Sequence, residues 1–178
     1  MVIYLVGYMA CGKTTLGEAL CARGYADFVD LDHEIESASG LTPAEWFALR
    51  GEGAFRVAVR EALERLAASG TERTVVVATG GGTASNADAM DFMLSHGRVV
   101  WLEASLERTI ERLLDAPGQR PLVAGMDADG LRAFIPSHLS QREPFYARAH
   151  QRFDSSRLDT EAEVADSVGR FIRLIGIT

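Results

Sequence analysis

Short apolar runs alternate along the chain with longer segments that carry helix signals. Strands are predicted at 2–6, 27–32, 74–78, 98–102 and 152–154. Helices are predicted between them, at 15–20, 33–39, 42–50, 52–68, 85–94, 105–114, 131–150 and 160–174. The run 74–78 is continuously apolar, as expected of a strand that is buried on both faces. Because strands and helices alternate throughout, the pattern predicts an α/β fold with helices on both faces of a parallel sheet.

Several predicted helices have recognisable ends. Thr160 begins a capping box that opens the last helix, and Ser85 is expected to cap the helix at 85–94. Gly51 is expected to break the helical stretch between 42 and 68. Pro136 and Pro144 are expected to interrupt the segment 131–150.

Composition narrows the class of protein. With 178 residues, of which 47% are hydrophobic and 24% charged, the chain is expected to form one compact domain spanning 1–178. The net charge of −7 argues against a nucleic-acid or anionic membrane partner. Cys11 and Cys21 are too few for a disulfide framework or a zinc site. No run is long enough to span a membrane, and the apolar start is too short for a signal peptide, so we expect a cytoplasmic protein. We also expect a monomer.

The first strand runs into a phosphate-binding loop. The motif G-x-x-x-x-G-K-[ST] is present as Gly7-Tyr8-Met9-Ala10-Cys11-Gly12-Lys13-Thr14. In a strand–loop–helix of this kind, backbone N–H groups and a helix N-terminus face one anion. Lys13 is the only lysine among the 18 lysine and arginine residues, as fits a phosphate cage that requires a compact ammonium. The loop therefore predicts an ATP site made of Gly7, Ala10, Cys11, Gly12, Lys13, Thr14 and Thr15, with the Thr14 hydroxyl on Mg²⁺.

Two more candidate elements follow predicted strands. Asp30 and Asp32 end the strand 27–32, where alternation would turn both carboxylates to one side, one towards Mg²⁺ and one towards an acceptor hydroxyl. Gly80, Gly81 and Gly82 follow the strand 74–78 and suit a backbone that approaches a ligand closely. A solvated turn and a flexible connector are the simpler alternatives. Ligands of parallel sheets bind at the carboxyl ends of strands, so the shared location with the phosphate loop favours a site.

Three arginines stand out by their positions. Arg56 lies early in a predicted helix that follows the acidic strand end. Arg120 lies in the segment 115–128, which is rich in Gly, Pro and Asp and is predicted to be a mobile lid. Arg142 lies on the helical segment after it. Each arginine taken alone could also form a surface ion pair.

Taken together, these elements resemble the shikimate kinase family over nearly the whole chain. The P-loop alone is shared by very many proteins, but the six matching elements in this order are specific. They are G-Y-M-A-C-G-K-T-T-L-G (7–17), D-L-D-x-x-I-E (30–36), G-E-x-A-F-R (51–56), G-G-G (80–82), R-P-L-V-A-G (120–125) and Q-R-E-P-F-Y (141–146). The resemblance implies a three-layer P-loop NTPase fold with a central five-stranded parallel sheet, a substrate-binding region at about 31–60 and a mobile lid at about 115–128. It also implies phosphorylation of the 3-hydroxyl of shikimate by ATP, with Mg²⁺, in aromatic amino-acid (chorismate) biosynthesis.

The resemblance also implies roles on the acceptor side. Asp32 would hold the shikimate hydroxyls and orient the attacking oxygen. An ordinary carboxylate pKa of about 4 is sufficient for this, because the transition state of phosphoryl transfer is loose. Arg56 and Arg142 would grip the shikimate carboxylate. Gly80, Gly81 and Gly82 would bring backbone close to the substrate.

On the nucleotide side, Thr14 and Asp30 would lie near Mg²⁺. Arg120 would reach from the lid to the phosphates, and Arg112, where the alignment is loose, would lie near the adenine. Lys13, Asp32 and Arg120 are the expected catalytic residues, since Lys13 and Arg120 would neutralise the transferring group.

The chain departs from the family pattern at two positions. Ala10 stands where many members have glycine, so the loop has to accommodate a Cβ there. Val59 stands where many members have a glutamate one helical turn after the arginine, so Arg56 would be held differently.

Other functions remain open from the sequence. Another small-molecule kinase of the same fold, acting on gluconate or a nucleoside monophosphate, is the nearest alternative. A GTPase would need a second lysine for its N-K-x-D motif, which this chain lacks. A catalytically silent nucleotide-binding homologue is less favoured, because every expected catalytic position is filled.

Overall fold

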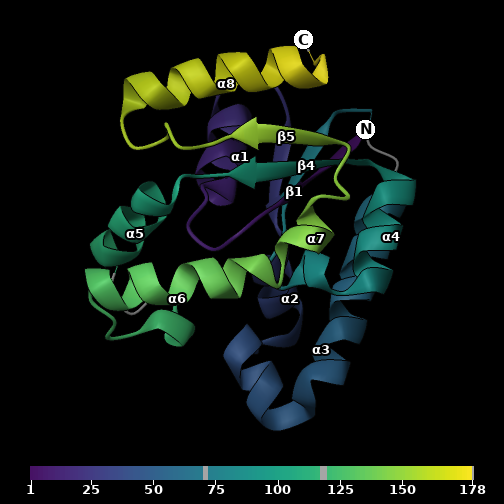
Figure 1. The fold of residues 1–178 in the computed structure, drawn as a ribbon. Helices are drawn as coiled ribbons and strands as arrows, with labels where there is room; N and C mark the ends of the chain where they lie inside the picture. The colour runs from purple at the N-terminus through teal and green to yellow at the C-terminus, as the bar shows by residue number, and fades with distance from the viewer. Residues whose placement is uncertain (70–71, 117–119, 178) are drawn as a thin grey trace.

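The structure is a computed structural model that describes residues 1–69, 72–116 and 120–177. Its five strands form one parallel sheet, as predicted, and their order in the sheet is β2-β3-β1-β4-β5 (Figure 1). The strands are β1 (Val2–Val6), β2 (Asp27–Asp30), β3 (Val75–Ala78), β4 (Arg98–Glu103) and β5 (Gln151–Asp154). Because β1 is flanked by β3 and β4, the order reverses next to β1. The loop that leaves its carboxyl end therefore lies at a topological switch point, where ligands bind in such sheets.

Helices cover both faces of the sheet (Figure 1). Ile3 and Leu5 of β1 face a buried cluster that includes residues of α1 and α8. Tyr4 and Val6 face the opposite cluster, to which α2, α3, α4 and α7 contribute. Alternate side chains of one strand thus contribute to two hydrophobic cores. The helices are α1 (Lys13–Ala22), α2 (Leu31–Ser39), α3 (Pro43–Ala68), α4 (Ala87–His96), α5 (Leu106–Asp115), α6 (Ala128–Ser140), α7 (Glu143–Tyr146) and α8 (Glu161–Ile175).

Several predicted boundaries were wrong. β2 ends at Asp30, and Asp32 lies in the first turn of α2 rather than on the strand. The reason is local, because the Asp30 carboxylate accepts hydrogen bonds from two backbone N–H groups of α2 and so caps that helix. Ser85 lies in a short 3₁₀ helix, η1 (Thr83–Ser85), and Asn86 caps α4 instead.

Not every proline or glycine that was expected to interrupt a helix does so. Pro136 lies inside α6 without interrupting it. It is on the exposed side of α6, where water can satisfy the carbonyl that has no N–H partner. Pro144 is in the first turn of α7, where proline is favourable, and Gly51 breaks α3 with a φ of 79° and a ψ of 165°.

The predicted lid is partly described, since residues 117–119 lie outside the described residues. It contains a 3₁₀ helix, η2 (Pro121–Val123), and Asp127 caps α6, so it has more local structure than its composition suggested. Val123 is buried in a third apolar cluster together with Leu113 of α5 and Leu131 of α6. The described part of this segment therefore packs on α5 and α6 beside the sheet (Figure 1). None of the helices in the described ranges is long and apolar enough to cross a membrane.

A pair of helix glycines tests how closely α1 packs on the sheet. A Cβ at Gly17 would lie 2.1 Å from a ring carbon of Phe28 on β2, whereas a Cβ at Gly169 in α8 would meet nothing closer than 3.5 Å. We expect Gly169→Ala to raise the free energy of unfolding by about 0.5–1 kcal/mol, because alanine is the better helix former. We expect Gly17→Ala to lower it by about 1–3 kcal/mol through overpacking. Urea denaturation of both variants measures the difference, and an equal gain at the two positions would contradict this packing.

Candidate active site

The phosphate loop connects β1 to α1, and its first glycine is required by its surroundings. Gly7 has a φ of 143°, and a Cβ there would lie 2.4 Å from the carbonyl oxygen of Leu102 on β4. No other residue type fits this position without moving the backbone of the neighbouring strand.

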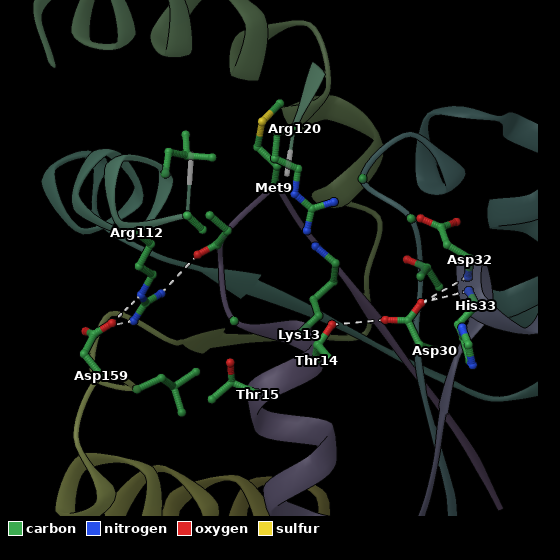
Figure 2. Close-up of a pocket in the computed structure, with 18 of the residues that line it drawn as sticks. Met9, Lys13, Thr14, Thr15, Asp30, Asp32, His33, Arg112, Arg120 and Asp159 are labelled. Atoms are coloured by element: carbon green, nitrogen blue, oxygen red, sulfur yellow. Dashed lines mark hydrogen bonds and ion pairs between the residues drawn. The ribbon is translucent and has the colours of Figure 1, made fainter. Parts of the chain in front are cut away.

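Lys13 is the first residue of α1, and its side chain folds back over the loop. Its Nζ atom donates to the carbonyl oxygens of Gly7 and Tyr8, both at 2.9 Å. The side chain lines a cavity of about 560 Å³ at the carboxyl ends of β1, β2 and β3, which we call the loop cavity. Figure 2 shows Lys13 and Arg120 directed into this cavity from the loop and the lid. Two cations thus face the mouth of a loop whose motif is typical of phosphate binding.

Thr14 and Asp30 supply two oxygen atoms at one side of the loop cavity (Figure 2). The Thr14 hydroxyl donates to Asp30 Oδ2 at 3.1 Å, while Asp30 Oδ1 accepts the backbone N–H groups of Asp32 and His33. The cap thus holds Asp30 in place, with its second oxygen against Thr14. In the described ranges there is no group of three or more acidic, His or Cys residues suited to a metal. One carboxylate and one hydroxyl fit Mg²⁺, which keeps waters and takes phosphate oxygens as further ligands.

Asp32 lies against the first residue of the triple glycine. A Cβ at Gly80 would lie 2.6 Å from Asp32 Oδ1, so glycine is needed there for the carboxylate to keep its place. Burial raises the pKa of Asp32, and the Asp30 charge raises it further, while Lys13 and Arg120 lower it. Asp32 is therefore a more basic carboxylate than the ordinary value assumed from the sequence. A Cβ at Gly81 or at Gly82 would meet no atom this close.

Arg120 connects the loop cavity to a second cavity. The second cavity has a volume of about 290 Å³, and we call it the side cavity. Both are lined by Met9, Gly81 and Arg120. The side cavity is also lined by Arg142, which comes from the turn before α7. An anion held in the side cavity would therefore lie next to one held by the phosphate loop.

Arg56 lines neither the loop cavity nor the side cavity. It lines a third cavity of about 210 Å³, which shares Phe47, Gly82 and Arg142 with the side cavity. Its guanidinium pairs with Glu52, one turn earlier in α3. Val59, one turn later, is buried and cannot pair with it. In this chain the carboxylate partner of Arg56 is therefore Glu52.

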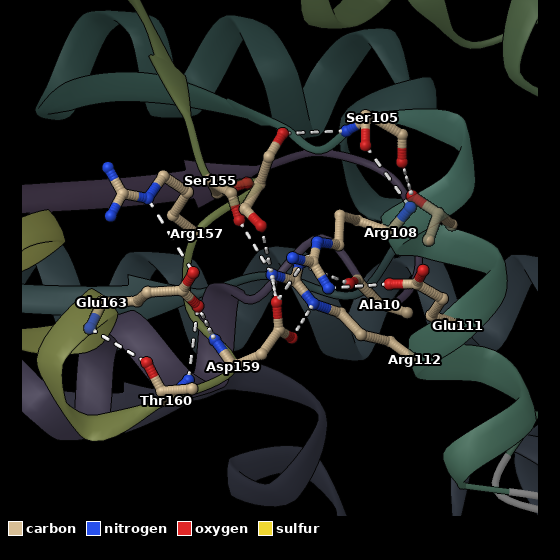
Figure 3. Close-up of polar contacts among 12 residues, drawn as sticks. Ala10, Ser105, Arg108, Glu111, Arg112, Ser155, Arg157, Asp159, Thr160 and Glu163 are labelled. Carbon is tan, nitrogen blue, oxygen red and sulfur yellow. Dashed lines mark hydrogen bonds and ion pairs between the residues drawn. The ribbon is translucent and has the colours of Figure 1, made fainter.

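Arg112 is held by a network on the other side of the loop cavity (Figure 3). Its Nε and Nη2 atoms donate to the two carboxylate oxygens of Asp159 at 2.7 and 3.2 Å, and Nη2 also donates to the Ser155 and Ser156 carbonyls. Its Nη1 atom donates to the Ala10 carbonyl at 3.2 Å. The hydrogen bonds from Arg112 lower the pKa of Asp159, so this carboxylate stays charged. Arg112 therefore ties the phosphate loop to the segment before α8.

Ala10, where the loop has to accommodate a Cβ, has an unusual backbone conformation. Its φ is 58°, and among the described residues it is the one non-glycine with a positive φ. The left-handed conformation costs roughly 1–2 kcal/mol for a residue with a Cβ. The hydrogen bond from Arg112 to its carbonyl helps to hold this conformation.

Several residues around these cavities had no signal in the sequence. Asp159 lies 47 residues from Arg112, and nothing in its local sequence marks it as a partner. The Tyr8 hydroxyl lies 2.7 Å from Nδ1 of His138, which in turn contacts Arg142. A histidine one helical turn before Arg142 could have been noticed, but only the fold brings it to the phosphate loop.

Comparison with known proteins agrees with this geometry. A family model described as shikimate kinase matches residues 9–173. A shikimate kinase of Parabacteroides distasonis is 37% identical over 173 residues, which cover 97% of this chain and 98% of the relative. A crystal structure of shikimate kinase from Bacteroides thetaiotaomicron has a TM-score of 0.90 at 37% identity and covers 99% of this chain and 98% of that one. A shikimate kinase from Acinetobacter baumannii in complex with shikimate has a TM-score of 0.76 at 31% identity, with 98% and 92% covered.

Replacing Ala10 tests whether the loop stores backbone strain. Ala10→Gly removes the Cβ from a left-handed position, which is worth roughly 1–2 kcal/mol, and adds a glycine entropy cost of about 0.5–1 kcal/mol. We expect the free energy of unfolding to rise by about 0.5–1 kcal/mol in urea denaturation without ligands. Ala19→Gly in the helical part of α1 is the control and should lower it by a similar amount. A loss of stability in both variants would contradict the strain at Ala10.

Proposed function

The chain belongs to the shikimate kinase family, and we infer that it transfers the γ-phosphoryl group of ATP to the 3-hydroxyl of shikimate. The products are shikimate 3-phosphate and ADP, a step of aromatic (chorismate) biosynthesis. The observation that carries this conclusion is the family match over residues 9–173. It spans residues 9–14 of the phosphate loop, Asp32 and the arginines of the side cavity. A gluconate or nucleotide kinase is not favoured.

We propose that residues 1–178 form a single kinase domain, with a phosphate loop at 7–14, a substrate-binding region at about 31–60 and a lid at about 115–128. The shared lining of the loop cavity and the side cavity supports this division. We further propose a monomer in the cytoplasm, where ATP is available. The two cysteines are free thiols, in keeping with a reducing compartment.

On the nucleotide side, the loop would bind the β- and γ-phosphates through its backbone, with Lys13 as the mobile cation. The ammonium would exchange two loop carbonyls for phosphate oxygens at little structural cost. Arg112 has its donors engaged, so it would contact the adenine through the face of its guanidinium. The remaining loop contacts are assigned to Gly7, Ala10, Cys11, Gly12, Thr14 and Thr15.

Thr14 and Asp30 would hold Mg²⁺, which when bound neutralises charge on the β- and γ-phosphates. The Thr14–Asp30 hydrogen bond supports this assignment, because it already brings two oxygen ligands together.

On the acceptor side, Asp32 would accept a hydrogen bond from the attacking hydroxyl and take its proton as the bond to phosphorus forms. Its raised pKa suits this role better than an ordinary carboxylate would. Arg142 and Arg56 would bind the shikimate carboxylate, and Gly80, Gly81 and Gly82 would line the substrate. Arg120, which lines both cavities, would neutralise the transferring group. Closure of the lid would exclude water, which otherwise competes as acceptor.

The proposal is tested by the acceptor dependence of ADP release. The purified protein is assayed with ATP, Mg²⁺ and one acceptor at a time, namely shikimate, gluconate and AMP. Shikimate should stimulate ADP release strongly, and the product should carry one phosphate on the 3-hydroxyl. Stimulation by gluconate or AMP instead, or by no acceptor, would contradict the proposed function.

Replacement of Lys13 tests the phosphate cage. Lys13→Ala should lower kcat by about 10²–10³-fold, as expected for the loss of one preorganised charge. Lys13→Arg should also fail, because the ammonium site between two loop carbonyls is too narrow for a planar fork. The control is Arg65→Lys, an arginine–lysine exchange on the exposed side of α3, which should keep the activity. Near-normal turnover by Lys13→Arg would show that the loop does not select an ammonium.

Substitution of the two aspartates tests their separate roles, Asp32 at the acceptor and Asp30 at the metal. Asp32→Asn should lower kcat by about 10²-fold or more through loss of the base, with the KM for ATP within a few-fold of the parent value. Asp30→Asn keeps the cap of α2, since asparagine is an equally good N-cap, but should move the Mg²⁺ dependence to higher concentration. Steady-state titrations of shikimate, ATP and Mg²⁺ measure these effects. If both variants titrate like the parent, neither carboxylate has the assigned role.

A further inference from the structure

His138 of α6 lies between the phosphate loop and the arginine of the side cavity. Nη1 of Arg142, one helical turn later, is in contact with both ring nitrogens, with Nδ1 at 3.1 Å and with Nε2. The Nδ1 atom also lies 2.7 Å from the Tyr8 hydroxyl. Phe134 stacks on the ring, with centroids 4.9 Å apart, and the Tyr8 ring meets it edge-on at 5.5 Å. The imidazole is therefore fixed on three sides.

These contacts require a neutral ring. A guanidinium can only donate hydrogen bonds, so the ring nitrogen that pairs with Arg142 has to accept and carries no proton. A doubly protonated ring would have no acceptor for Arg142. The arrangement thus requires a neutral His138.

The surroundings favour the neutral ring. The titratable groups facing it are Arg142, from the turn before α7, and Tyr8, from the phosphate loop. Arg120 lines the side cavity together with these two residues. In the described part of the chain, no carboxylate forms a hydrogen bond or ion pair with His138. Burial lowers the pKa of His138, and the Arg142 charge lowers it further. Burial raises the pKa of Tyr8 to about 12, so its phenol is neutral as well.

The contact with His138 determines which edge of Arg142 is left for a ligand. Only Nη1 of the guanidinium is engaged by His138, which leaves the edge formed by Nε and Nη2. Nε is buried and has no hydrogen-bond partner among the described residues. An unpaired buried donor of a cation is costly, so this edge calls for an acceptor. Nε and Nη2 point in parallel, as a bidentate carboxylate requires.

We propose that neutral His138 is a positioning residue that turns the Nε–Nη2 edge of Arg142 towards the carboxylate of the acceptor substrate. The inference rests on the proposed function, in which Arg142 binds the shikimate carboxylate. Through Tyr8, the same imidazole connects the acceptor site to the phosphate loop. Protonation of His138 removes the acceptor for Nη1 and places two cations in contact, so Arg142 leaves its position. The affinity for shikimate therefore falls in acid, while the nucleotide site is unaffected.

Two substitutions distinguish the effect of the hydrogen bonds of His138 from the effect of its protonation. His138→Gln keeps an oxygen to accept from Arg142 and an N–H₂ group to donate to Tyr8, but it does not titrate. His138→Leu keeps the bulk and removes both hydrogen bonds. His96→Gln is the matched control, because His96 lies on α4 with partners Ser95 and Phe92, outside the three cavities. The kcat and the KM values for shikimate and ATP are measured for the four proteins from pH 5.5 to 8.5.

At pH 7.5, we expect His138→Leu to raise the KM for shikimate about tenfold, as for loss of a hydrogen bond to a charged group, with kcat and the KM for ATP within about threefold. His138→Gln should match the parent at this pH. Between pH 7.5 and 5.5 the shikimate KM of the parent and of His96→Gln should rise several-fold more than that of His138→Gln. An acceptor whose carboxylate is converted to an amide should show no difference between the parent and His138→Leu.

Three results would overturn the proposal. The first is an unchanged shikimate KM in His138→Leu, and the second is an equal loss in both KM values and kcat, which would indicate general damage. The third is an acid rise in His138→Gln as large as that of the parent, and it can be measured even if His138→Leu does not fold. Failure of the proposed function would look different, since the parent itself would then show no shikimate-dependent ADP release.

Discussion

The site depends on the geometry that a parallel sheet imposes at the end of β1. Because β1 lies between β3 and β4, the segments that follow all three strands emerge at one edge of the sheet. The phosphate loop can turn there only because Gly7 accepts a φ of 143° beside the backbone of β4. Its shape is then maintained from outside by Arg112, which binds the Ala10 carbonyl and is itself anchored by Asp159 (Figure 3). Backbone conformation and a single partly buried arginine thus prepare the loop before any nucleotide arrives.

The cations around the site fall into two groups by their partners. Arg56 and Arg112 each pair with a carboxylate, Glu52 and Asp159 respectively. Lys13 has only loop carbonyls as partners, apart from the Cys11 thiol, and Arg120 has no hydrogen bond or ion pair within the described residues. Since a carboxylate partner cancels much of a cation's field, the unpaired cations are the ones able to stabilise charge on a transferring phosphoryl group. Because the net charge of the chain is −7, this local positive charge has to come from individual side chains at the site and not from the protein as a whole.

Local features of the sequence predicted most of the fold and part of the site. Short strand-like segments, most of them apolar, predicted the five strands. The phosphate loop and Gly51 were evident because glycine and motif spacing act over a few residues. The predicted position of Asp32 on the strand was wrong, because the strand ends where the Asp30 side chain caps α2. The alternation of side chains along a strand does not show that an aspartate can end the strand by capping a helix. The pairs Arg112–Asp159 and Tyr8–His138 join residues 47 and 130 positions apart, so no local pattern could have predicted them. The side cavity arises in the same way, from segments that meet only in the folded chain.

The partner of Arg142 differs in kind from those of Arg56 and Arg112. A glutamate at position 138 would hold the guanidinium as well as a histidine does, but it would cancel the charge that a substrate carboxylate needs. A neutral imidazole accepts the hydrogen bond and leaves the full positive charge on Arg142. The stacking of Phe134 and the contact with Tyr8 partly bury the ring, and partial burial favours the uncharged form. The arrangement therefore combines a fixed orientation with an undiminished charge, and its consequence is that the orientation is lost when the imidazole is protonated.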